Sequence, residues 1–223
     1  MPHEIVRKTS AVVLVAALLG AAPAHAVKVE FVALSPADQW DARTYRKIWD
    51  EYGERIIAAF ETVTCLPFTE PRVAAIVADD VSDSGGPKHP MQLRGTYARA
   101  MKQATLVHEL GHRHLWQLSE RLEGIDGHMT LYLVLDEVWA RVWGEQFAKE
   151  RIAAESGWEA SYDYERAWRW SRSLPRPERV RLWNQLLVLN GFSGGCDALL
   201  DAPGDVRKDR GPRVRSPSKR AKD

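Results

Sequence analysis

The chain has little cysteine, almost no net charge and no long apolar run after residue 26. Its two cysteines, Cys65 and Cys196, belong to no close pair of the spacing that structural zinc sites use. They form either one disulfide or two separate buried thiols. The formal net charge of +1 creates no strong field for nucleic acid or membrane. The sequence therefore indicates an ordinary globular domain that acts on neither.

Residues 1–26 have the features of a secretory signal peptide. Basic residues precede an apolar run at 11–22, and residues 24–26 offer small side chains where a signal peptidase reads. The run is shorter than the roughly 20 residues that span a bilayer, and Pro23 ends it. We expect cleavage after Ala26, leaving a periplasmic or secreted protein with no transmembrane segment.

The remaining chain is long enough for one domain with a proper core, which we assign to residues 27–200. Hydrophobic periodicity and turn residues predict a mostly helical α+β fold. Residues 201–223 are rich in Lys, Arg, Asp, Pro and Ser, and we expect a disordered basic tail there. The pattern predicts strands at 27–34 and 72–79, helices at 36–60, 96–119, 129–155, 162–173 and 176–190, and a loop at 80–95.

The motif His108-Glu109-Leu110-Gly111-His112 lies within the helix expected at 96–119. Residues four apart share one face of a helix, so His108 and His112 can direct their imidazoles at one metal ion. Glu109 lies about 100° around the helix from His108, within reach of a water on that metal. This is the H-E-x-x-H arrangement of zinc peptidases. It predicts Zn²⁺ as the cofactor and Glu109 as the catalytic residue.

A third metal ligand is expected from the helix predicted at 129–155. Asp136 and Glu137 are the only charges between residues 131 and 139, and their neighbours are apolar. A buried carboxylate is costly unless it is paired or bound to metal. We predict Glu137 as the ligand, with Asp136 as the alternative and Glu145 as a more distant choice. An ion pair of Glu137 with Arg141, without metal, fits the same pattern.

These residues resemble the gluzincins, the thermolysin-like clan of zinc peptidases. The resemblance covers roughly residues 72–147 and implies that His108, His112 and Glu137 bind zinc. It also implies that Glu109 is the general base and that the substrate is a peptide or protein. Thermolysin itself has an aspartate at the position of Arg141, so the likeness is to the clan rather than to that enzyme.

Several other residues have two interpretations each. Residues 73–78 are either an edge strand that holds an extended substrate through main-chain hydrogen bonds or an ordinary core strand. His128 is interpreted as a capping or surface residue, although it can assist the reaction. His114 points away from the metal face, and we expect it to be partly exposed. The resemblance further implies an oxyanion-stabilising tyrosine, for which Tyr162 and Tyr164 are both candidates.

Another zinc group, the metzincins, does not fit. Its motif continues with glycine and histidine where this chain has Leu115 and Leu118. The sequence thus favours an exported zinc metallopeptidase. The competing hypothesis is a non-catalytic envelope protein, either stabilised by zinc or binding a partner through its helices. Convergence of the ligands on one open point distinguishes the two hypotheses.

Overall fold

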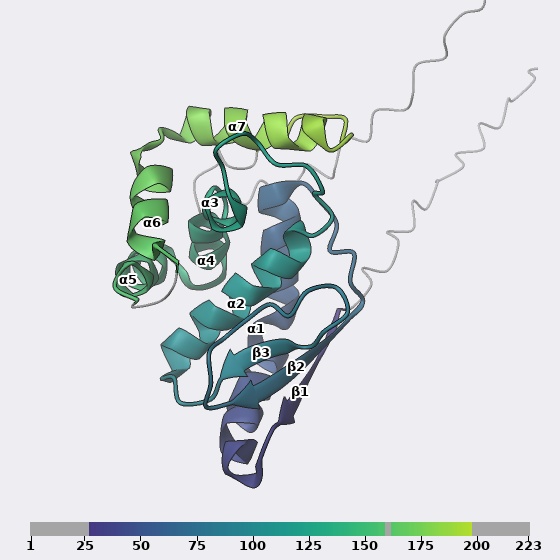
Figure 1. Ribbon diagram of the computed structural model, residues 1–223, viewed down its shortest axis with the longest axis vertical. Helices are drawn as coiled ribbons and strands as arrows, with labels where there is room; N and C mark the ends of the chain where they lie inside the picture. The colour runs from purple at the N-terminus through teal and green to yellow at the C-terminus, as the bar shows by residue number, and fades with distance from the viewer. Residues whose placement is uncertain (1–26, 159–161, 198–223) are drawn as a thin grey trace, which may run out of the picture.

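The computed structural model describes residues 27–158 and 162–197 (Figure 1). The expected signal peptide and basic tail lie outside the described residues. The predicted mostly helical α+β class is confirmed: a small parallel sheet occupies one end, α3 to α7 gather at the other, and α1 and α2 run between them. The elements are β1 (Lys28–Ala33), η1 (Pro36–Asp38), α1 (Gln39–Thr64), β2 (Arg72–Ala78), β3 (Met91–Arg94), α2 (Arg99–Leu115), α3 (Gly127–Tyr132), α4 (Leu135–Trp143), α5 (Glu145–Ser156), α6 (Tyr164–Ser173) and α7 (Arg176–Leu189).

The three strands pair in parallel in the order β1-β2-β3. Alternate residues of each strand are buried, so one face of the sheet packs on the core. β2 occupies the centre of the sheet, so residues 73–78 are the ordinary core strand of the two alternatives and not an edge strand that could hold a substrate. The edge near α2 is β3, which lies inside the loop predicted at 80–95. Four residues between Pro90 and Gly95 gave too short a pattern to predict a strand.

The long helix expected at 129–155 is three helices, α3, α4 and α5. α3 ends where the carbonyl of Leu133 accepts hydrogen bonds of 2.7 and 3.1 Å from Arg179. α4 ends at Gly144, whose φ of 95° is open to glycine but strained for other residues. These breaks turn the chain, so that α5 and α6 come back towards α2 and α3 (Figure 1). None of the helices formed by the described residues is long and apolar enough to cross a membrane.

Gly111 allows α2 to pack closely against its neighbours. A Cβ at this position would lie 2.5 Å from Leu131 Cδ1 and 3.3 Å from Phe60 Cζ. A glycine in the middle of a helix costs about 1 kcal/mol relative to Ala, which a close approach by another backbone would explain. Side chains of α1 and α3 make that approach instead, and they hold the motif helix against both elements.

His114 is buried, with 1% of its surface exposed, although we expected partial exposure. Its ring packs against Phe60 and Phe68, with centroids 5.3 Å away in each case. Nε2 lies 2.9 Å from the hydroxyl of Thr64, whereas Nδ1 has no partner among the described residues. Burial lowers the pKa of His114 to about 3. The side of α2 away from the metal face is therefore covered by α1 and by the segment that follows α1.

Cys65 and Cys196 form a disulfide, with their Cα atoms 5.7 Å apart. This decides between the two alternatives that the sequence left open. The bond links the end of α1 to the segment after α7, across a sequence separation of 131 residues. It therefore closes most of the domain into one covalent loop.

His114 should make the stability of the metal-free protein depend on pH. The unfolded chain gains a proton on His114 below about pH 6.5, but the folded protein does not until about pH 3. The contribution of His114 to the free energy of unfolding is therefore complete above pH 6.5 and is lost as the pH falls. Between about pH 7.5 and about pH 5 it amounts to about 2 kcal/mol. His114→Phe keeps the ring contacts and should reduce the measured loss of unfolding free energy by that amount, as determined by urea titration with EDTA present. An equal loss in both proteins would contradict the assignment.

Candidate metal centre

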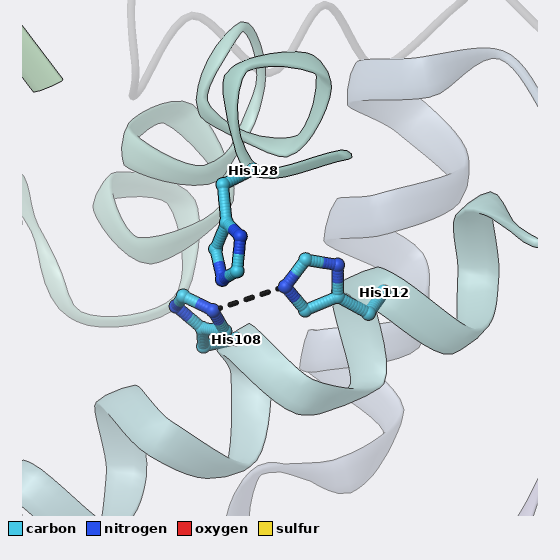
Figure 2. A group of neighbouring side chains, drawn as sticks. All are labelled: His108, His112 and His128. Carbon is cyan, nitrogen blue, oxygen red and sulfur yellow. Dashed lines mark hydrogen bonds between the residues drawn. The ribbon is translucent and has the colours of Figure 1, made fainter. Parts of the chain in front are cut away.

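Three histidines from two helices converge on one point. His108 and His112 lie on α2 at the expected four-residue spacing, and His128 lies in the first turn of α3. One ligand-type nitrogen of each lies within 4.8 Å of the others, and Nε2 of His108 is 3.1 Å from Nε2 of His112. Figure 2 shows the ring of His128 reaching down between the other two. Three imidazoles in this arrangement can serve as metal ligands.

The centre is buried on one side and reaches the surface on the other. His108 is 1% exposed, whereas His112 and His128 are half-buried. Burial and the neighbouring His108 lower the pKa of His112 well below its usual range, and lower that of His128 to about 4. Both imidazoles are thus neutral at pH 7, which is the form that binds a metal ion.

A buried carboxylate fixes the orientation of His108. Glu155 of α5 is fully buried, and its Oε1 lies 3.0 Å from Nδ1 of His108. Its Oε2 accepts hydrogen bonds of 3.0 Å from the hydroxyl of Tyr132 and from Nε1 of Trp168. Burial lowers the pKa of His108, but Glu155 outweighs it and the net direction is upward. A proton held on Nδ1 leaves Nε2 as the atom that can bind metal.

Glu109, the predicted catalytic residue, is 7% exposed and directly follows His108 on α2. Burial raises the pKa of its carboxyl to about 7, and Asp83 and Glu155 add to the rise while His108 opposes it. A carboxyl with a pKa near neutrality can both take up and return a proton at pH 7. Its position and its proton affinity both suit a general base.

Half-exposed aromatic rings border the histidines. The ring of Tyr164 lies 5.1 Å from that of His128 and 6.2 Å from that of His108. Trp158 contacts Tyr164 edge-on at 5.3 Å and stacks with Tyr97 at 6.3 Å. Burial and the nearby Glu109 raise the pKa of Tyr164 to about 12, so its hydroxyl keeps its proton at neutral pH. A protonated hydroxyl beside the centre is available as a hydrogen-bond donor.

The structure does not bring Asp136 or Glu137 into this group. Arg179 of α7 binds Asp136 with two hydrogen bonds, and Arg176 donates to Oε1 of Glu137. Both acids line a separate cavity of about 200 Å³. Glu145 also lines that cavity, and its Oε2 lies 3.8 Å from Nζ of Lys149. The sequence correctly indicated that the two acids need partners, but these partners are arginines of a later helix.

Sequence reasoning missed His128 as a member of the group. One feature of the sequence could have indicated it. A histidine, which is a common metal ligand, directly follows the turn after the motif helix, where the chain changes direction and passes His112. We expected His128 to be a capping or surface residue, but the cap is Asp126, whose side chain accepts a hydrogen bond from the N–H of Met129. His128 therefore lies one residue inside α3, and its ring faces α2 (Figure 2).

Comparisons of the chain with protein-family models, with curated proteins and with solved structures find no match. The geometry of the three histidines and their neighbours is therefore the basis for a function.

Glu155→Gln should lower the pKa of His108 in the metal-free protein. The amide can still accept the hydrogen bond, but it carries no charge to offset the effect of burial. The measurement is an NMR titration of the imidazole resonances of both proteins in EDTA. An unchanged pKa for His108 would show that the Glu155 charge does not hold its proton.

Proposed function

We propose that this protein is a zinc-dependent metallopeptidase that acts outside the cytoplasm. The observation that carries the proposal is the convergence of His108, His112 and His128 beside Glu109. Three imidazole nitrogens fit Zn²⁺ and leave a fourth position for water or substrate, as catalytic zinc sites do. When bound, Zn²⁺ polarises the substrate carbonyl and lowers the pKa of a water molecule.

Each nearby residue then has a definite role. Glu109 accepts a proton from the attacking water and passes it to the leaving amine. Glu155 holds His108 in the tautomer and orientation that expose Nε2. The ring of Tyr164 borders those of His108 and His128, and we assign to its protonated hydroxyl a hydrogen bond to the oxygen that gains charge.

This ligand set differs from the one that the gluzincin resemblance implied. His128 takes the place of Glu137 as the third proposed ligand, so the resemblance now rests on the motif helix. His128 precedes α4, whereas the gluzincin ligand would lie on the helix that carries Glu137. The proposed reaction is unaffected, because three histidines and two histidines with one glutamate both leave zinc an open position.

The disulfide between Cys65 and Cys196 supports an exported location. Such bonds form and persist in oxidising compartments such as the periplasm and the extracellular space. This agrees with the signal peptide expected at residues 1–26.

A structural zinc centre is the second candidate function, and one feature of the sheet edge favours it. The main-chain groups of Gln92 on β3 are bonded to those of Asp83, at 2.7 and 3.1 Å. An extended peptide could pair with Gln92 only if the segment at Asp83 moved away. A protein with zinc but without hydrolysis would match this second function.

Replacing His128 and replacing Glu137 should have different effects on zinc binding. His128→Ala removes a proposed ligand and should weaken zinc affinity at least about 100-fold, more than the usual loss of an outer-shell partner. Glu137→Gln should leave the affinity within a few-fold of the wild type. Competition with a chromophoric chelator measures both. The opposite ranking would restore Glu137 as the ligand.

Glu109→Gln should keep zinc and lose hydrolysis. The amide cannot take the proton from water, so the rate should fall about 10²–10⁴-fold. The readout is cleavage of a mixed-peptide library, with zinc content measured in parallel. The matched control is Glu150→Gln, which changes a half-exposed carboxylate on α5 and should leave both values unchanged. Hydrolysis that survives in Glu109→Gln would exclude its proposed role, and wild-type protein that binds zinc without cleaving any peptide would support the structural centre.

A further inference from the structure

α3 carries one of the three histidines but is only six residues long. Isolated helices shorter than about 12–15 residues are marginal in water, because nucleation fixes several residues for one hydrogen bond. Intrinsic helix stability therefore does not hold His128 in place. Its position must come from contacts at the start of α3 and against the ring itself.

Asp126 fixes the start of α3 through hydrogen bonds of its side chain and its main chain. Its Oδ1 caps the helix by accepting a hydrogen bond of 2.8 Å from the backbone N–H of Met129. Its carbonyl accepts bonds from the backbone N–H and the hydroxyl of Thr130, at 2.9 and 2.8 Å. The hydroxyl of Tyr162 lies 2.9 Å from each carboxylate oxygen of Asp126. Tyr162 thus supports the cap that sets the first turn of the helix.

The ring of Tyr162 also stacks on His128. The centroids are 4.1 Å apart and the planes differ by 25°. The other described rings around His128, those of His108, His112, Tyr132 and Tyr164, meet it at angles of 54° to 87°. Tyr162 is therefore the ring that lies against the face of this imidazole and limits its rotation. It is itself placed by the next residue, Asp163, which caps α6 through the N–H of Arg166 at 2.9 Å.

We propose that Tyr162 is the positioning residue for His128, acting through its ring on the imidazole and through its hydroxyl on Asp126. The inference rests on the proposed metal centre, and it gives His128 a support comparable to the one that Glu155 gives His108. It also gives different roles to Tyr162 and Tyr164, which the sequence offered as equal candidates for stabilising the oxyanion. The hydroxyl of Tyr162 bonds to Asp126, whereas the ring of Tyr164 borders the rings of both His108 and His128.

The test is zinc affinity and the visible spectrum of the cobalt-substituted protein, for the wild type, Tyr162→Phe and Tyr162→Ala. Tyr162→Phe keeps the stacked ring and should lose less than about 10-fold in affinity, whereas Tyr162→Ala should lose about 10–100-fold, the usual range for an outer-shell partner. The cobalt spectrum reports ligand geometry at saturation, and it should change in Tyr162→Ala and be restored in Tyr162→Phe. A general loss of stability would not change the spectrum of folded protein that is saturated with cobalt, nor restore it in Tyr162→Phe.

Two controls make the test specific. Tyr52→Ala removes a half-buried tyrosine that packs on Trp143 away from the histidines, and it should change neither affinity nor spectrum. Asp126→Asn combined with Tyr162→Phe should cost no more than the larger single change, because the hydroxyl acts through Asp126.

The outcomes are distinct. Wild-type protein that binds no zinc would overturn both the metal centre and this inference. Zinc binding with unchanged affinity and spectrum in Tyr162→Ala would overturn the inference alone. The predicted ordering without any peptide cleavage would support the positioning role while contradicting the peptidase function.

Discussion

The contact between His108 and Glu155 is the interaction on which the candidate site depends. A fully buried carboxylate is tolerable only when donors surround it, and Glu155 has three, from α2, α3 and α6. Each hydrogen bond to a charged group contributes about 1.5–3 kcal/mol, so the same contacts that orient His108 also hold four helices together. The candidate metal site and the helical end of the fold therefore share one polar centre.

The site is supported in two different ways. α2 is a long helix packed closely on α1 and α3 at Gly111, and it positions His108, Glu109 and His112 as a rigid set. His128 comes from a short helix and depends on Asp126 and on the chain that begins α6. The order of helices from α3 to α6 thus has a direct consequence for the chemistry, because it brings Glu155 and the tyrosines back to the motif.

Local patterns were sufficient to predict the α+β class, both long strands and the motif helix, and they put His108 and His112 at the spacing with which the two rings meet in the structure. Those predictions depend on spacing within one helix or strand. Apart from β3, whose four residues were too few for a pattern, the differences involve distant partners. Arg176 and Arg179 satisfy the acids that resembled metal ligands, and Arg179 also ends α3 at Leu133. His128 and Glu155 are single residues whose meeting with His108 depends on the breaks between α3, α4 and α5, which hydrophobic periodicity did not show.

The central claim is that His108, His112 and His128 share one zinc ion. X-ray absorption at the zinc edge, followed by anomalous diffraction from crystals of the zinc-loaded protein, tests it most directly. We expect one anomalous peak bonded to three imidazole nitrogens at about 2.0–2.1 Å, with an oxygen as the fourth ligand. A peak bonded to Glu137, or a loaded protein whose zinc lies away from His128, would contradict it.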